Sequence, residues 1–214
     1  MNRTKKSPLR RLNSDLEKNT IVINTSHSKE LNKALKIEAN HSTKHKMVEL
    51  KARVNDLDSL RKRLADLGAE YKCTFHQRDQ YFVVPEGRLK LRTLQDSESA
   101  ELIYYERENI LGPKSDDAYI LSVHQHEDLK HILTKILKPL IVVEKNREIY
   151  QHKGTQIHLD RVKKLGDFIE FEREVADNQE SIEKGFQVLE NLTTLLKIHS
   201  SNLESLSYSD LLEK

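Results

Sequence analysis

The chain has 214 residues, of which 36% are hydrophobic and 33% are charged, and its formal net charge at pH 7 is only +2. This length suits one domain with tails, and the lack of an apolar run of about 18 residues argues against a membrane-spanning segment. Cys73 is the only cysteine, which excludes an internal disulfide bond and favours a reducing compartment such as the cytoplasm.

The first 45 residues have the composition of a disordered tail, because they are rich in Lys, Asn, Ser and Thr and contain few large apolar side chains. Their apolar spacing allows a short helix over residues 29–39. The bases before Asp15 also fit a mitochondrial presequence, or a contact with nucleic acid or a membrane surface, so a mitochondrial or nuclear location stays open. We expect a disordered basic tail over residues 1–45 and one folded domain over residues 46–214.

Strict alternation of charged and apolar side chains predicts the first element of this domain, a strand over residues 47–54. Leucines at helical spacing then predict a helix over residues 56–68, which Asp56 would begin and Gly68 would end. Further strands are expected at residues 74–84, 88–92 and 100–107.

The second half of the domain is expected to continue with a loop at residues 112–117, where a Gly-Pro pair breaks the pattern, and a short strand at 118–123. Apolar residues at helical spacing predict helices over residues 129–137 and 179–197. Strands are expected between these helices at residues 140–150, 155–162 and 167–175. Residues 207–212 are predicted to be a short docking segment. The short connections between strands favour an antiparallel sheet.

The charged faces of these strands are unusual, because acids and bases are segregated by strand. The ordinary interpretation of one such strand is a sheet whose charged face meets water. Taken together, the strands favour an α+β fold in which about eight antiparallel strands close into a barrel that can hold one small ligand. The charged faces would point inward, and helices would cover the apolar outer faces.

Four acids on three of the predicted strands are candidates for an all-oxygen metal site. Hard carboxylates suit Mg²⁺, Mn²⁺ or Ca²⁺ rather than zinc. The alternative is that each acid only pairs with a neighbouring base on a sheet surface. The four acids are Glu49, Asp160, Glu170 and Glu172.

The bases that alternate along the strands are candidates for binding a polyanion. Many cations in one barrel would repel each other, so the cavity makes sense if it receives two or three phosphates together with a metal ion. A basic outer surface for nucleic acid is the alternative, but no aromatic stripe for stacking bases accompanies these residues. The bases are Lys51, Arg53, Arg88, Lys90, Arg92, Arg107, Lys145 and Arg147.

The histidines and tyrosines of the chain are weaker candidates for site residues. His124 and His126 are interpreted as incidental surface residues, because two histidines without a third ligand make no metal site. His158 lies two residues before Asp160 and so is expected on the same face, where it could line the cavity. Tyr81 and Tyr105 are interpreted as packing residues.

The sequence resembles the CYTH superfamily of triphosphate tunnel metalloenzymes, and within it the class IV adenylyl cyclase-like branch. The family's leading motif is Glu-x-Glu-x-Lys, which reads Met47-Val48-Glu49-Leu50-Lys51 here, with Met47 in place of the first glutamate. The matching segments span residues 46–213 in order. They include Gly87-Arg88-Leu89-Lys90-Leu91-Arg92, Val143-Glu144-Lys145-Asn146-Arg147, Ile157-His158-Leu159-Asp160 and Phe168-Ile169-Glu170-Phe171-Glu172.

This resemblance implies an eight-stranded antiparallel tunnel that binds a triphosphate-containing small molecule with Mg²⁺ or Mn²⁺. It implies metal binding by the four acids, triphosphate binding by the eight bases, and catalytic roles for Glu49 and Lys51. The implied activity is that of a class IV adenylyl cyclase, which converts ATP to cyclic AMP and pyrophosphate. Two alternatives remain: a triphosphatase acting on tripolyphosphate, thiamine triphosphate or a nucleotide, and a non-catalytic polyphosphate- or nucleotide-binding module. No nucleic-acid partner is expected.

Overall fold

The computed structural model describes residues 43–95 and 97–214. The expected helix at residues 29–39 and nearly all of the expected tail lie outside the described residues. Residues 43–45, which were assigned to the tail, are instead the start of the first strand. In the part of the chain that the structure describes, none of the helices is long and apolar enough to cross a membrane.

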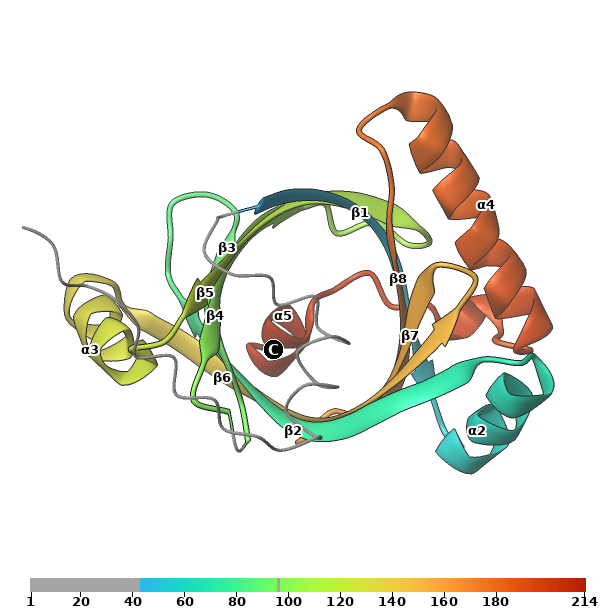
Figure 1. The fold of residues 1–214 in the computed structure, drawn as a ribbon, viewed down its shortest axis with the longest axis horizontal. Helices are drawn as coiled ribbons and strands as arrows, with labels where there is room; N and C mark the ends of the chain where they lie inside the picture. Colours follow the sequence, from blue (N-terminus) through green and yellow to red (C-terminus); the bar gives the residue numbers. More distant parts are fainter. Residues whose placement is uncertain (1–42, 96) are drawn as a thin grey trace, which may run out of the picture.

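Eight strands close into an antiparallel barrel in the spatial order β1-β5-β4-β3-β2-β6-β7-β8 (Figure 1). The predicted barrel is therefore confirmed. The strands are β1 (Thr43–Val54), β2 (Glu70–Phe82), β3 (Arg88–Leu94), β4 (Ala100–Arg107), β5 (Lys114–Val123), β6 (Pro139–His152), β7 (Thr155–Val162) and β8 (Gly166–Glu174).

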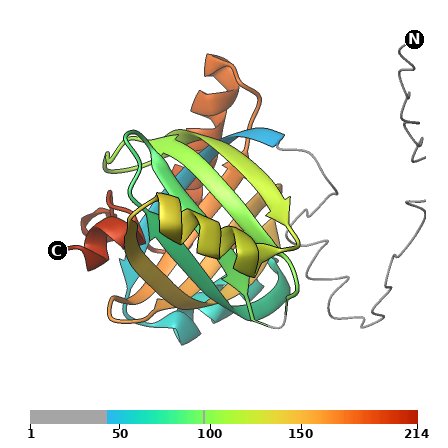
Figure 2. The ribbon, with the colours of Figure 1, turned by 90° about the vertical axis from the view of Figure 1, so that its left-hand side faces the viewer.

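The helices lie outside the barrel wall, with one exception. They are α2 (Leu57–Asp66), α3 (His126–Ile136), α4 (Gln179–Leu195), the 3₁₀ turn η1 (Ser200–Asn202) and α5 (Tyr208–Leu212). Helices α2 and α4 pack on one side of the barrel and α3 lies on the opposite side, whereas α5 lies across one end of it (Figures 1 and 2). Asp56 begins α2 as predicted, because its side chain accepts a hydrogen bond from the backbone of Ser59.

The apolar face of β1 explains why α4 covers it. Val48, Leu50 and Ala52 are almost fully buried and belong to one core cluster with the leucines of α2 and α4. Gly185 is where α4 approaches most closely, since a β-carbon there would lie 2.7 Å from the Val48 side chain. The alternation of β1 thus places its apolar side chains outward under α4 and its charged side chains inward.

The predicted loop at residues 112–117 is wrong, because residues 114–117 are part of strand β5. Lys114, Asp116 and Ala118 continue one alternating face, and β5 pairs with both β1 and β4. Lysine and aspartate are rare in strands, so the segment has the composition of a loop. It is a strand here because the interior of the barrel is itself polar.

Candidate functional site

The barrel encloses a cavity of about 940 Å³, whose wall carries acidic and basic side chains among apolar and neutral polar ones. Of the twelve predicted site residues, nine border it. The acids are Glu49, Glu170 and Glu172, and the bases are Lys51, Lys90, Arg92, Arg107, Lys145 and Arg147. The inward-pointing charged face predicted for the barrel is therefore what the structure shows, while the chemical role of each residue is a separate question.

The acids of β1 and β8 meet the bases of neighbouring strands. Lys51 Nζ lies 3.1 Å from Glu170 Oε1, and Arg147 donates to the other oxygen of Glu170. Arg107 of β4 pairs with Glu49 of β1 over the intervening strand β5. Burial alone would raise the pKa of Glu170, but Lys51, Lys145 and Arg147 outweigh it and hold that pKa well below its ordinary value. Glu170 is therefore ionised at neutral pH.

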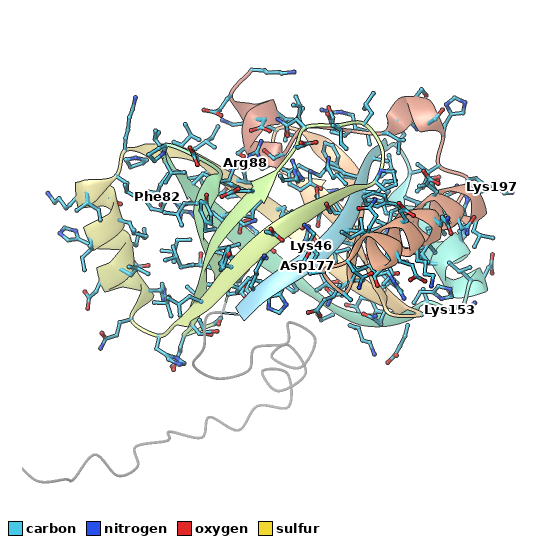
Figure 3. All side chains as sticks on the ribbon, turned by 90° about the horizontal axis from the view of Figure 1, so that it is seen from above. Lys46, Phe82, Arg88, Lys153, Asp177 and Lys197 are labelled. Atoms are coloured by element: carbon cyan, nitrogen blue, oxygen red, sulfur yellow. The ribbon has the colours of Figure 1, made fainter. Side chains whose placement is uncertain are left out.

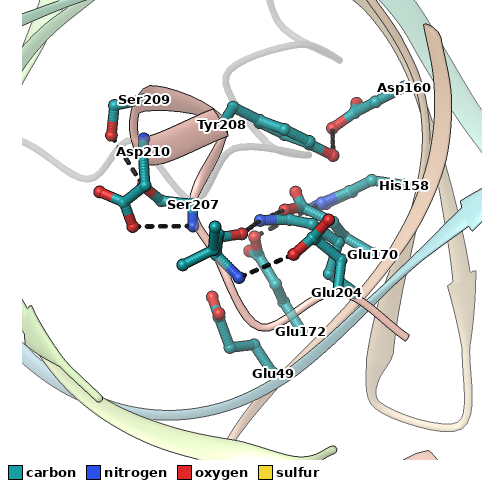
Figure 4. Close-up of polar contacts among 12 residues, drawn as sticks. Glu49, His158, Asp160, Glu170, Glu172, Glu204, Ser207, Tyr208, Ser209 and Asp210 are labelled. Atoms are coloured by element: carbon teal, nitrogen blue, oxygen red, sulfur yellow. Dashed lines mark hydrogen bonds and ion pairs between the residues drawn. The ribbon is translucent and has the colours of Figure 1, made fainter. Parts of the chain in front are cut away.

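Asp160 lies behind this cluster rather than on the cavity wall. Its side chain is fully buried and accepts hydrogen bonds from Arg147 Nε at 2.7 Å and from Lys145 Nζ at 2.9 Å. The Tyr208 hydroxyl donates a further bond of 2.9 Å (Figure 4). In this arrangement the carboxylate of Asp160 orients two bases, and a metal ion would have to displace them to reach it.

A second group of charges lies on β2 and β3. Asp79 is buried between Arg92, whose Nε donates to it at 3.0 Å, and Lys90, whose amino group lies 3.0 Å away. Burial would raise the pKa of Asp79, but Arg92 and Lys90 hold it far below its usual range. Asp79 was not among the predicted site residues, since an isolated acid in a β-strand gives no sign of its partner. It fixes the positions of both bases.

Two predicted phosphate-binding residues lie apart from the main cavity. Arg53 is 44% exposed, contacts Glu204 and lies over the Phe168 ring. Arg88, labelled in Figure 3, pairs with Asp210 of α5 at 2.8 Å. It borders a second hollow of about 850 Å³ at the end of the barrel where α5 lies. These two bases could meet a ligand only at the rim.

Sequence reasoning missed Lys114 and Asp116 because it assigned them to a loop. Both are buried and border the hollow near α5, and Asp116 also borders the main cavity. Burial, together with the negative charges of Glu49 and Glu172, raises the pKa of Asp116 to about 8. Burial, with Arg107 nearby, lowers the pKa of Lys114 to about 8. The only available signal was the alternation that continues backward from Ala118.

Two other groups also have shifted pKa values. Burial beside Arg147 lowers the pKa of Lys145 to about 8. The same two causes lower the pKa of His158 well below its ordinary value, so its ring is neutral. Perturbed groups that gather in one cavity are typical of functional sites.

The described residues fit a divalent cation. His158, Glu170 and Glu172 each offer a ligand atom, and these atoms lie within 4.8 Å of one another. Figure 4 shows Glu49, Glu170, Glu172 and His158 grouped in the barrel interior. Among the described residues, one oxygen of Asp116 and Nδ1 of His158 are buried without a hydrogen-bond partner. Carboxylates with an imidazole form a donor set that suits several divalent ions.

Comparison with known proteins identifies relatives over most of the chain. The sequence model of one family, the CYTH domain, matches residues 45–206. The chain is 27% identical over 176 residues to adenylate cyclase CyaB of Aeromonas hydrophila, covering 78% of this chain and 88% of that protein. It is 27% identical over 178 residues to a putative adenylate cyclase of Methanocaldococcus jannaschii, covering 77% of this chain and 97% of that protein.

Solved structures share the fold. The PH1012 protein of Pyrococcus horikoshii superposes with a TM-score of 0.69 at 25% identity, covering 77% of this chain and 98% of that one. A putative adenylyl cyclase from Hippeastrum, described as having a dominant triphosphatase activity, has a TM-score of 0.54 at 14% identity. That alignment covers 78% of this chain and 93% of the Hippeastrum chain.

Proposed function

The chain belongs to the CYTH domain family, and from that premise we propose that it is a divalent-metal-dependent enzyme that cleaves a triphosphate inside its barrel. The observation that carries this proposal is the arrangement of charge in one enclosed cavity. Carboxylates gather on β1, β5 and β8, while most of the bases come from β3, β4 and β6. A phosphate chain with a divalent cation would satisfy both sets of charges.

The bases would hold the phosphates. Lys90 and Arg92 are fixed by Asp79, and Lys145 and Arg147 are fixed by Asp160. Donors that are already oriented stabilise developing charge without having to reorganise during the reaction. Arg88 and Arg53 are proposed to contact only the parts of a substrate that reach the rim.

The carboxylates Glu49, Glu170 and Glu172 are proposed to hold Mg²⁺ or Mn²⁺, with Asp160 supporting the site through its bases. When bound, such an ion lowers the pKa of an attacking hydroxyl or water and neutralises phosphate charge. Lys51 lies between Glu170 and the Tyr208 ring, where its charge can stabilise a phosphate oxygen. Glu49 and Lys51 are therefore the proposed catalytic residues, and α5 would limit water entry at one end.

The reaction favoured by the sequence relatives is cyclisation. The 3′-hydroxyl oxygen of ATP would attack the α-phosphorus, the bond to pyrophosphate would break, and the hydroxyl proton would leave to solvent or to a carboxylate. The bases would stabilise the pyrophosphate that departs. The names of the A. hydrophila and M. jannaschii proteins support this direction.

Hydrolysis of a triphosphate is the second candidate. The cavity wall carries charged groups from several strands, and these can satisfy a phosphate chain without contacts to a base or a sugar. The Hippeastrum structure, with its reported triphosphatase activity, shows that this fold is compatible with hydrolysis. A non-catalytic binding module is a third candidate, supported by Met47 at the position of the family's first motif glutamate.

Phosphorus NMR distinguishes the three candidates. The full chain would be incubated separately with ATP, tripolyphosphate and thiamine triphosphate, each with Mg²⁺ or Mn²⁺, and a Glu172→Gln variant would serve as the metal-site control. Pyrophosphate with a cyclic phosphodiester indicates a cyclase, and orthophosphate without a cyclic product indicates a hydrolase. Line broadening in Mg²⁺ without turnover indicates a binding module. Turnover that is unaffected by EDTA and by the Glu172 substitution would contradict the proposed metal dependence.

A further inference from the structure

His158 is a buried histidine beside two carboxylates of the barrel interior. It lies on β7 directly opposite Glu170 of β8, and its side chain is only 2% exposed. Its Nε2 lies 3.2 Å from the side-chain oxygen of Gln156, an arrangement in which Nε2 carries the proton and donates it. The other ring nitrogen, Nδ1, therefore has a free lone pair.

That lone pair faces an acceptor rather than a donor. Nδ1 of His158 lies 3.5 Å from Oε1 of Glu172, and within the described residues it has no hydrogen-bond partner. Nδ1 is buried, so its unsatisfied lone pair costs free energy, and the neighbouring carboxylate oxygen has no proton to offer it. A cation between them would satisfy both.

Glu172 is the acid best able to accept such a cation. Its side chain is 31% exposed and borders the cavity, and its Oε1 lies 3.5 Å from Nδ1 of the neutral His158 and 4.0 Å from Nη1 of Arg147. Glu170 completes the group, although Lys51 and Arg147 contact its oxygens. A cation that binds here would compete with these bases for Glu170 and would meet little competition at Glu172.

We propose that Nδ1 of His158 is a ligand of the cation held by Glu170 and Glu172, and that this nitrogen makes the site select Mn²⁺ over Mg²⁺. Mg²⁺ favours a shell of oxygen ligands and dehydrates reluctantly. Mn²⁺ belongs to the first-row transition ions, which bind mixed nitrogen and oxygen sites as a series. The bond from Nε2 to Gln156 is the outer-shell contact by which metal-binding histidines are usually oriented. This proposal adds a nitrogen ligand to the all-oxygen site expected from the sequence, and it rests on the proposed function only for the location of the metal.

Electron paramagnetic resonance tests the proposal without substrate. Mn²⁺ would be titrated into the metal-free full chain, and free Mn²⁺ would be followed by its solution spectrum. Pulsed measurements on bound Mn²⁺ would then detect the modulation caused by a directly coordinated nitrogen. The variant is His158→Gln, and the matched control is His131→Gln, which changes an exposed histidine on α3 outside the barrel.

The wild-type chain and the His131→Gln control should show nitrogen modulation, and His158→Gln should lose it. Mn²⁺ affinity of His158→Gln should fall on the order of 10- to 100-fold, the range already seen when outer-shell partners are lost. Mg²⁺ affinity, measured by competition against Mn²⁺, should change much less. Bound Mn²⁺ without nitrogen modulation in the wild-type chain would overturn the proposal, whether or not His158→Gln folds.

Persistence of the modulation in a folded His158→Gln variant would also overturn it, because another histidine would then be the ligand. The outcome is independent of the phosphorus NMR result. Nitrogen modulation in a chain that turns over no triphosphate would support the ligand and contradict the enzyme. Metal-dependent turnover without nitrogen modulation would contradict the ligand alone.

Discussion

The hydroxyl of Tyr208 donates a hydrogen bond of 2.9 Å to Oδ2 of Asp160, and this bond connects helix α5 to strand β7 in the interior of the barrel. The amino groups of Lys51 and Lys145 lie 4.2 Å and 4.8 Å from the centroid of the same ring. Tyr208 thus contacts an acid through its hydroxyl and two bases through its ring. The C-terminal helix is fixed by the charges of the cavity that it covers.

Substitution of Tyr208 should separate these two contacts. Tyr208→Phe removes only the hydroxyl, and Asp160 keeps its two bases, so the free energy of unfolding should fall by about 1 kcal/mol. Tyr208→Ala also removes the buried ring, and the loss should reach about 3–5 kcal/mol. Urea unfolding measures both, with Tyr71→Phe as a control in which an exposed hydroxyl is lost. Equal losses for Phe and Ala would contradict a role for the ring.

Arg92→Ala should weaken triphosphate binding far more than monophosphate binding. A single phosphate can form its ion pairs and hydrogen bonds with the other bases of the cavity. Isothermal titration calorimetry with tripolyphosphate and orthophosphate measures the difference. Arg161→Ala is the matched control, since Arg161 is 65% exposed on the outside and pairs with Asp167. Equal losses for the two ligands would indicate only a general electrostatic effect.

Arg88→Ala should behave differently from Arg92→Ala because Arg88 lies at the rim. Its loss also removes the 2.8 Å ion pair with Asp210 of α5. We therefore expect a smaller loss of triphosphate affinity than for Arg92→Ala, together with faster hydrogen exchange of the α5 backbone amides. Unchanged exchange would show that this ion pair does not hold α5 in place.

Asp116 should make the stability of the metal-free protein depend on pH. Its pKa is about 8 in the folded state and about 3.8 when unperturbed, so between these values the folded state holds a proton that the unfolded state releases. The stability from this proton is complete below about pH 4 and is lost as the pH rises through about 8.

Asp116→Asn cannot ionise, so its melting temperature in EDTA should rise relative to the wild-type value as the pH increases from about 5 to about 9. Comparison at each pH cancels the contributions of Lys114 and Lys145, whose pKa values are lowered to about 8 and which act in the opposite direction. A difference in melting temperature that stays constant across this range would mean that Asp116 titrates normally.

Met47→Glu should add a carboxylate to an already acidic part of the cavity. Met47 borders the cavity and lies opposite Asp116 on one side and Glu174 on the other. We expect a lower melting temperature in EDTA and a larger rise on addition of Mn²⁺ than in the uncharged control Met47→Gln. Activity that appears only in Met47→Glu would favour the binding module for the natural chain, and activity already present in the natural chain would exclude it.

Alternation along the strands was enough to predict the barrel and the inward direction of its charges. It placed Glu49 and Lys51 on the cavity wall because a side-chain period of two fixes the face. The alternation could not predict how deep inside the barrel each side chain lies. Arg53 belongs to the same face as Lys51, but it lies at the exposed end of β1. Position along a strand becomes position along the barrel only after closure sets the tilt and the stagger of the strands.

The sequence also could not predict which charged residues on different strands contact each other. Asp160 has the same alternation as Glu170, yet its place next to Arg147 in the register buries it beneath two bases. Asp116 was missed because a polar strand facing a polar interior lacks the contrast that identifies most strands. Its pKa is raised by burial and then by Glu49 and Glu172, which approach it because β1 lies between β5 and β8.

The position of β1 between β5 and β8 also has a consequence for synthesis on the ribosome. His45 of β1 contacts Glu174 of β8, which is 129 positions later in the chain. At about 5–20 residues per second, β1 would be made roughly 6–25 s before the strand that completes its pairing. Pairings of such long sequence separation form slowly, and an edge without its partner can join a wrong strand. We therefore expect the β1–β8 seam to close last and to be the step at which nascent chains most need protection from aggregation.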